Sequence, residues 1–294
     1  MFGLLNINKP AGVTSRKVVD LVQEAVGTDK AGHAGTLDPL ATGVIVVCVG
    51  SATRLVDYIQ RMRKYYRGTF RLGCSSPSDD TETDVTRRDD LPIPDVQQLT
   101  AALRQWTGTI QQRPPAYSAV KVAGRRAYKL ARQGKPVQLA ARQVTVYQLA
   151  LVRYDYPELV LDICCSAGTY VRSLGRDLAA SLGTAAVMSA LTRTAIGRFR
   201  LADAVALEDL GTHNVLQHML PADLAVAELP RTELTSGEVA RIVNGRRIER
   251  EGWAAGGEEE IAAFDTSGRL LAILKPGAAG ILAPIRVFPP PAAG

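Results

Sequence analysis

Apolar residues occur along the chain in two patterns, short runs and helical spacing, which distinguish predicted strands from predicted helices. Short apolar runs at residues 4–7 and 44–48 predict strands. Valines and leucines at helical spacing follow Ser15, which predicts a helix that Ser15 caps and Gly27 ends. The same patterns predict further strands at 64–72, 144–154 and 159–165, and further helices at 52–60, 95–106 and 170–182.

A second, smaller unit is predicted after the dipeptide Leu229-Pro230. Its pattern gives one short helix at 236–243 and strands near 260–265, 270–274 and 285–288, a mostly β module. We therefore expect a main domain at 1–228 and a second domain at 229–294.

Strands and helices alternate irregularly, without the steady strand–helix–strand order of a doubly wound sheet. The pattern favours an α+β fold with a mixed, largely antiparallel sheet. Neither the Walker nor the dinucleotide glycine fingerprint occurs, so no nucleotide cofactor is expected.

Composition narrows the class of protein. The chain has 294 residues, of which 46% are hydrophobic, enough to fill a core and to argue against disorder. The longest purely apolar run, 44–49, is much shorter than the roughly 20 residues of a membrane span. No basic segment precedes an apolar stretch at the N-terminus, so neither a membrane span nor a secretory signal is expected.

Cysteine and histidine usage argues against a disulfide framework and against a metal site. The four cysteines show no zinc-type spacing, and only three histidines are available to assist them. This usage is typical of the reducing cytoplasm.

The formal charge of +6 is unevenly distributed. No acidic residue lies between Asp95 and Asp155, whereas the segment after Leu229 carries eight residues of each sign. Tyr117, Tyr128 and Tyr147 interrupt the basic interval, a pattern that suits a polyanion with exposed bases, although a solvated cationic face remains an alternative. Its ten basic residues are Arg104, Arg113, Lys121, Arg125, Arg126, Lys129, Arg132, Lys135, Arg142 and Arg153.

Residues 32–43 are the densest candidate for chemistry. They read GHAGTLDPLATG, and three glycines and a proline predict a fixed loop. Asp38 precedes Pro39, which favours an extended backbone at Asp38. Its carboxylate is either a nucleophile or base, or a side chain that caps the next turn.

This dodecapeptide resembles the active-site motif of the TruB family, the bacterial tRNA pseudouridine-55 synthases. Further segments resemble family motifs in the same order, namely 8–15, 64–66, 113–121, 168–172 and 191–193. The basic stretch near 110–145 resembles the family's RNA-embracing insertion, and 234–239 with 244–247 resemble a PUA domain.

The resemblance implies an enzyme that isomerises uridine-55 in the T-loop of tRNA to pseudouridine. It implies the tRNA T-arm as partner, no cofactor, no metal, no membrane and no obligatory protein partner. It makes Asp38 the catalytic nucleophile and Arg172 the cation paired with it. Whether Asp38 attacks C1′ of the sugar or C6 of the base stays open.

The other implied site residues surround the base. Tyr66 matches the tyrosine that stacks on the flipped uracil and takes part in proton removal from C5. Tyr170 and Leu191 match residues of the uracil pocket, and His33 matches the residue that fills the space left by the flipped nucleotide. Without the resemblance, the two tyrosines and the leucine would be read as core residues. Asp80 is the best match to the aspartate of the acidic loop, although residues 76–80 depart from the family's Thr-Asp-Thr pattern.

Two other functions compete with this interpretation. The first is a tRNA-folding chaperone with incidental catalysis, and the second is a guide-RNA-dependent synthase subunit. A combination of Asp38, Tyr66 and Arg172 favours the enzyme, because a pure binder needs no charge-compensated carboxylate. The balanced tail, which lacks a lysine-rich extension, disfavours the guide-dependent subunit.

Overall fold

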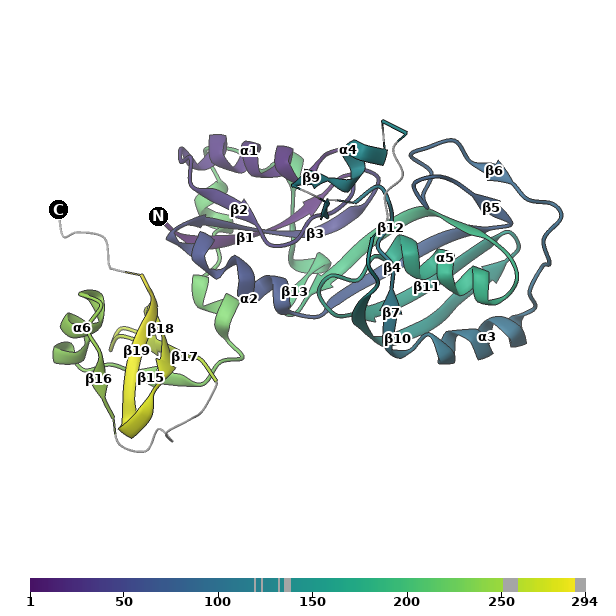
Figure 1. Ribbon diagram of the computed structural model, residues 1–294. Helices are drawn as coiled ribbons and strands as arrows, with labels where there is room; N and C mark the ends of the chain where they lie inside the picture. The colour runs from purple at the N-terminus through teal and green to yellow at the C-terminus, as the bar shows by residue number, and fades with distance from the viewer. Residues whose placement is uncertain (119, 123, 132, 135–138, 251–258, 289–294) are drawn as a thin grey trace.

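The computed structural model describes the whole chain except residues 119, 123, 132, 135–138, 251–258 and 289–294. A ten-stranded mixed sheet forms the larger part, and a separate five-stranded sheet forms the C-terminal part (Figure 1). The α+β class predicted from the irregular alternation is confirmed.

In the N-terminal half of the large sheet, β1 (Phe2–Lys9) pairs antiparallel with β3 (Thr42–Gly50). Almost all of β3 is buried, because its two faces contact two different cores. Helix α1 (Ser15–Val26) covers one face with its valines, while the 3-10 turn Ser51–Leu55 and helix α2 (Val56–Arg61) cover the other. Burial on both faces explains the unbroken apolar run.

The second half of the sheet is antiparallel and covered by helices on one face. Its strands are β4 (Lys64–Leu72), β11 (Glu158–Cys165), β10 (Arg142–Asp155) and β7 (Gly108–Gln112). Helices α3 (Val96–Gln105) and α5 (Val171–Ser181) pack against it over Phe70 and neighbouring apolar side chains. Alternation along β4 therefore places Tyr66 on one face, and Tyr65 and Arg67 on the other.

Strand β12 (Ala186–Ile196) joins the two halves and was missed by the sequence pattern. It runs parallel to β3 at Thr192 and Arg193, and antiparallel to β4 along nearly its whole length. Polar residues interrupt its apolar alternation, and one of them, Arg193, lines the cavity described below.

The C-terminal sheet packs against the first half of the large sheet. Its strands are β15 (Arg231–Glu233), β16 (Ile248–Glu249), β17 (Ile261–Phe264), β18 (Leu270–Pro276) and β19 (Ile281–Val287), with α6 (Ser236–Val243) alongside. The rings of Phe2 and Phe288 stack at 5.1 Å, and Arg286 pairs with Asp57 at 3.2 Å. The predicted helix at 236–243 is confirmed, whereas the last strand begins four residues before its predicted start.

Two predicted helix starts need correction. Thr14, not Ser15, caps α1 by accepting from the Lys17 N–H, and the hydroxyl of Ser15 bonds a distant loop instead. The helix predicted at 52–60 divides into the 3-10 turn and α2.

The remaining short elements are β2 (Ala31–His33), β5 (Cys74–Ser75), β6 (Thr86–Arg87), β8 (Lys121–Val122), β9 (Arg125–Arg126), α4 (Ala127–Ala131), β13 (Phe199–Arg200) and β14 (Val205–Ala206). Across the part of the chain that the structure describes, every helix is too short or too polar to cross a membrane.

Candidate active site

A cavity of about 1280 Å³ opens where the loop before β3 lies beside β4, β12 and the start of α5. All the site residues predicted from the sequence line it: His33, Asp38, Tyr66, Tyr170, Arg172 and Leu191. Arg126, Tyr128 and Arg142 of the basic interval line the same cavity. The fold thus brings together residues that lie up to 158 positions apart, from His33 to Leu191.

The loop that carries Asp38 is held at its end by a glycine that the sheet requires. Gly43 has a φ of +97°, and a Cβ there would lie 2.3 Å from the carbonyl oxygen of Arg193. Only glycine allows β3 to approach β12 at this register. Ser15 fixes the middle of the loop, because its hydroxyl accepts from the Leu37 N–H at 2.8 Å and donates to the Leu37 carbonyl at 2.9 Å.

Arg193 is a functional residue whose role the sequence did not reveal. It is buried, and its guanidinium donates to the carbonyl oxygens of Val44 (2.7 Å), Gly35 (3.1 Å) and Thr36 (3.3 Å). An arginine in the middle of a strand is the one signal that could have marked it, and the strand itself was not predicted.

Lys9 holds the other side of the same loop. Its fully buried ammonium donates to the carbonyl oxygens of Val13 (2.6 Å), Pro10 (2.8 Å) and Pro39 (3.3 Å). Two buried cations bonded to the backbone therefore hold the loop of Asp38, in addition to Gly43 and Ser15.

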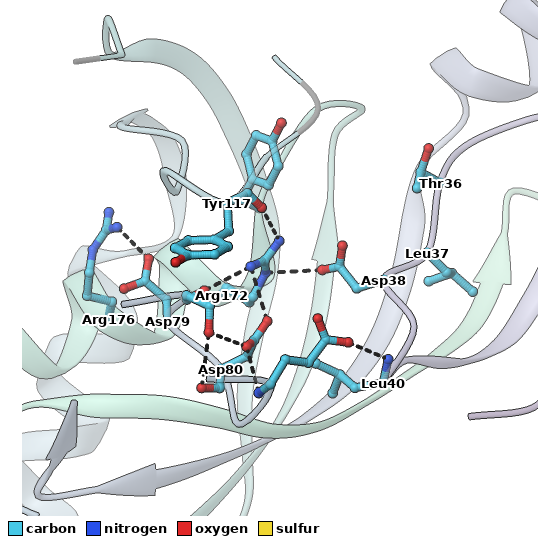
Figure 2. A network of polar contacts seen from close by, with 12 residues as sticks. Thr36, Leu37, Asp38, Leu40, Asp79, Asp80, Tyr117, Arg172 and Arg176 are labelled. Atoms are coloured by element: carbon cyan, nitrogen blue, oxygen red, sulfur yellow. Dashed lines mark hydrogen bonds and ion pairs between the residues drawn. The ribbon is translucent and has the colours of Figure 1, made fainter. Parts of the chain in front are cut away.

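The side chain of Asp38 forms an ion pair and does not cap the following turn. Arg172 Nε lies 3.1 Å from Asp38 Oδ2, while the turn is closed by the Ala41 N–H donating to the Asp38 carbonyl. Arg172 Nη1 lies 3.1 Å from Asp80 Oδ2, so one guanidinium bridges two carboxylates (Figure 2). The Asp38 side chain is 35% exposed and that of Asp80 is fully buried, which leaves Asp38 as the carboxylate open to the cavity.

The acidic loop fixes Asp80 and reaches back to the loop of Asp38. Asp80 Oδ1 accepts from the Ser78 hydroxyl at 2.5 Å and from the Glu82 N–H at 3.0 Å. Glu82 in turn accepts from the Leu40 N–H at 3.1 Å. Arg172 also donates to the Ser78 carbonyl at 2.8 Å, so both ends of this arginine are held before any ligand binds.

Burial dominates the proton equilibria of the site. It raises the pKa of Asp38, with Arg172 opposing that effect and Asp80 adding to it. Burial also raises the pKa of Tyr66, which keeps the phenol protonated, and lowers that of His33, which favours a neutral imidazole. For Lys9 and Lys64, burial lowers the pKa to about 8.

The apolar and aromatic residues form the walls of the cavity. The guanidinium of Arg142 lies over the Tyr170 ring at 4.7 Å, and Tyr170 is anchored by two hydrogen bonds between its backbone and the Gln112 amide. Leu191 is buried in the core at 6% exposure while also lining the cavity. A planar, uncharged ring would find stacking partners here beside a carboxylate.

Within the described ranges, no group of three or more histidine, cysteine, aspartate or glutamate side chains is arranged to hold a metal ion. All four cysteines are buried and free. The chemistry that this geometry supports directly is nucleophilic or electrostatic catalysis by a carboxylate.

Comparison with known families decides the assignment. Residues 23–171 match the N-terminal domain of the TruB family pseudouridylate synthases, and residues 229–289 match the C-terminal domain of tRNA pseudouridine synthase II. The chain belongs to the TruB family. It is 40% identical over 294 residues to tRNA pseudouridine synthase B of Thermobifida fusca, covering 97% of this chain and 98% of the relative. The protein of the same name from an Arthrobacter species is 41% identical, covering 98% and 97%.

Solved structures share the fold of this TruB-family protein. A chain of an H/ACA RNP bound to a substrate RNA containing 2′-deoxyuridine matches with a TM-score of 0.76 at 24% identity, covering 98% of this chain and 86% of that chain. A chain of a Cbf5-Nop10-Gar1 complex also matches with a TM-score of 0.76, at 25% identity and coverages of 98% and 85%. The family is one of isomerases, so the protein is an enzyme of the pseudouridine synthase class.

Proposed function

We propose that this protein converts uridine-55 in the T-loop of tRNA to pseudouridine, with Asp38 as the catalytic carboxylate. The observation that carries the proposal is the bridge of Asp38, Arg172 and Asp80 at the base of the cavity. The tRNA pseudouridine synthases B of similar length support tRNA as the substrate.

The reaction breaks the N1–C1′ bond, turns the uracil and joins C5 to C1′; C5 loses a proton and N1 gains one. An ionised Asp38 assists by bonding to C1′ or C6, or by stabilising electron-poor C1′. Arg172 keeps the carboxylate ionised against the effect of burial, because its charge opposes the rise in pKa. Asp80 holds the opposite side of the arginine.

The remaining cavity residues receive the base once it has left the RNA stack. Tyr66 lies beneath the uracil, and burial keeps its phenol protonated; it takes part in proton removal from C5 as a relay, giving up its own proton as its oxygen accepts the one from C5. Tyr170 and Leu191 form the pocket walls, and a neutral His33 occupies the space left by the flipped nucleotide. Flipping is required because N1 and C5 are inaccessible in a stacked loop.

RNA affinity is assigned mainly to the basic insertion near 110–145. Arg125, Arg126 and Lys129 are exposed on β9 and α4, while Arg132 and Lys135 lie outside the described residues. We assign the catalytic domain to 1–228 and a PUA-like RNA-binding domain to 229–294. We further propose that the enzyme acts in the cytoplasm, without cofactor or obligatory protein partner.

Incubation of the purified protein with an unmodified tRNA transcript tests this function. Pseudouridine is mapped by chemical labelling and reverse-transcription stops, and a transcript with cytidine at position 55 serves as the matched control. We expect one stop, at position 55, that is absent from the control. A stop elsewhere, or none, contradicts the proposal.

Two further measurements separate the competing functions. A folding chaperone would refold a misfolded tRNA equally well with Asp38→Asn, in which we expect no isomerase activity. The fold shared with the Cbf5-Nop10-Gar1 complex is the observation that favours a guide-dependent subunit. Such a subunit would modify the bare transcript only after a guide RNA and partner proteins were added.

A further inference from the structure

A second arginine lies one helical turn from Arg172 on the same face of α5. Arg176 Nη1 pairs with Asp79 Oδ2 at 2.7 Å, beside the bridge formed by Arg172 and Asp80 (Figure 2). Consecutive carboxylates of the acidic loop thus bind arginines spaced i and i+4 on one helix. The pair is half-buried, with side chains 32% and 14% exposed, and it does not line the cavity.

The backbone of Asp79 is held in an unusual conformation to make this pair. Its φ is +61°, and no other residue besides glycine has a positive φ in the part of the chain that the structure describes. The left-handed region is unfavourable for a residue with a Cβ and persists where the surroundings determine it. Here the Asp79 carbonyl accepts from the Met188 N–H at 3.0 Å, which ties the loop to β12.

Both arginines also hold segment 113–118, the first part of the basic insertion. Arg172 Nη2 donates to the Tyr117 carbonyl at 3.0 Å, and Arg176 Nη2 donates to the Arg113 carbonyl at 3.2 Å. Helix α5 therefore connects the acidic loop to segment 113–118 at two points. Of these, only the Arg172 connection also touches Asp38.

Segment 113–118 is joined directly to the exposed basic part of the insertion. The Tyr128 N–H of α4 donates to the Ser118 carbonyl at 3.0 Å. A backbone hydrogen bond thus links segment 113–118 to α4, which carries Lys129 and follows Arg125 and Arg126.

We propose that Asp79 and Arg176 form a positioning pair that fixes the basic insertion beside the cavity, so that its basic side chains are already placed to bind RNA. This inference rests on the proposed tRNA-modifying function. Because neither residue touches the reacting atoms, loss of the pair weakens tRNA binding while leaving the chemical step of the bound complex intact.

The test compares Arg176→Gln with Arg67→Gln, a matched control. Like Arg176, Arg67 forms an ion pair with an aspartate, Asp162. This pair is on the surface, and Arg67 lies on the opposite face of β4 from Tyr66. We expect Arg176→Gln to raise the Kd for tRNA about tenfold. The single-turnover rate at saturating enzyme should stay within about threefold of the parent, and the control within about twofold in both measurements.

Two further variants separate positioning from general damage. Asp79→Asn keeps a side chain that tolerates the left-handed backbone but removes the charge, and it should raise the Kd as well. Combining it with Arg176→Gln should weaken binding no further than the arginine variant alone. Arg176→Lys keeps the charge but has a single ammonium in place of a fork that contacts both Asp79 and Arg113, so its Kd should lie in between.

The outcomes distinguish this inference from the proposed function. If the parent protein forms no pseudouridine, the proposed function fails. If the parent is active and Arg176→Gln has the parent's Kd, or loses only thermal stability or single-turnover rate, the positioning pair is refuted while the function stands. Additive effects of the two substitutions would equally refute a joint role.

Discussion

The loop 32–43 and the basic insertion near 110–145 both border the cavity, but they are held in different ways. Arg193 and Lys9, both buried, donate six hydrogen bonds to backbone carbonyls in and around the loop. In the insertion, Arg125 and Lys129 are exposed to solvent, and hydrogen bonds from Arg172 and Arg176 hold segment 113–118.

The difference matches two different physical tasks. Catalysis depends on holding a carboxylate within a fraction of an ångström of its working position. Several buried hydrogen-bond donors therefore fix the loop that carries it. Affinity for a polyanion depends on the number of phosphates neutralised, which exposed flexible side chains supply well. Substitutions in the loop should therefore change rate, and substitutions in the insertion should change binding and its salt dependence.

The clearest separation of catalytic rate from tRNA binding is expected from Asp38→Asn. The amide is nearly isosteric and still accepts a hydrogen bond from Arg172, but it lacks the charge and nucleophilicity of the carboxylate. We expect the single-turnover rate to fall by about 10³-fold or more with little change in the Kd for tRNA. Retained turnover would remove Asp38 from the mechanism, and a joint loss of binding and rate would show that it shapes the loop instead.

For tRNA binding, the basic insertion should dominate the dependence of the binding constant on salt. Each phosphate contact contributes a slope of roughly −0.7 in log K against log salt on single strands, so neutralising Arg125, Arg126 and Lys129 together should flatten the plot by on the order of two units. Deleting the balanced tail from Leu229 should weaken binding with a smaller change of slope. Both proteins are titrated with one tRNA over one salt series. If the tail deletion removes most of the slope, the basic interval is only a solvated face.

A smaller effect, on the stability of the fold around Arg172, is expected from Gly175→Ala in α5. A Cβ at this position would lie 2.1 Å from the Phe70 ring, so the helix that carries Arg172 must shift. We expect the free energy of unfolding to fall by about 1–3 kcal/mol in denaturant titration. Gly237→Ala in α6 is the matched control, because nothing lies within 4 Å of its Cβ, and it should be neutral or stabilise by up to about 1 kcal/mol. Equal effects at both glycines would contradict the packing argument.

The smallest expected effect is a shift in pH dependence. Burial raises the pKa of Asp38, so if Asp38 acts as an ionised carboxylate, as we propose, activity should fall with decreasing pH at values above the ordinary aspartate pKa. The charge of Asp80 raises the pKa of Asp38 further. Asp80→Asn should therefore move the acid limb of kcat/KM towards lower pH, whatever its effect on the maximal rate. An acid limb that stays in place would show that another group controls it.

Local sequence was sufficient for much of the fold, and the resemblance of short motifs to the TruB family pointed to the candidate site. Residues 64–72 form a strand with the predicted bounds, α6 spans the predicted residues, and α3 begins at the capping residue Asp95. Each depends on the spacing of apolar residues or on a cap within four positions, which a sequence displays directly. The dodecapeptide and the arginine motif likewise identified Asp38 and Arg172, and the structure places these two 3.1 Å apart.

Only the tertiary structure decided how that site is held together. Strand β12 is defined by pairing with β3 and β4, more than 100 residues away, and its polar residues conceal it from any periodicity. The bonds of Arg193 to the Asp38 loop and of Arg176 to Asp79 and Arg113 join segments 63 to 158 residues apart. Nothing in the local pattern specifies such contacts, because a buried guanidinium finds its acceptors only after distant backbones have been packed against one another.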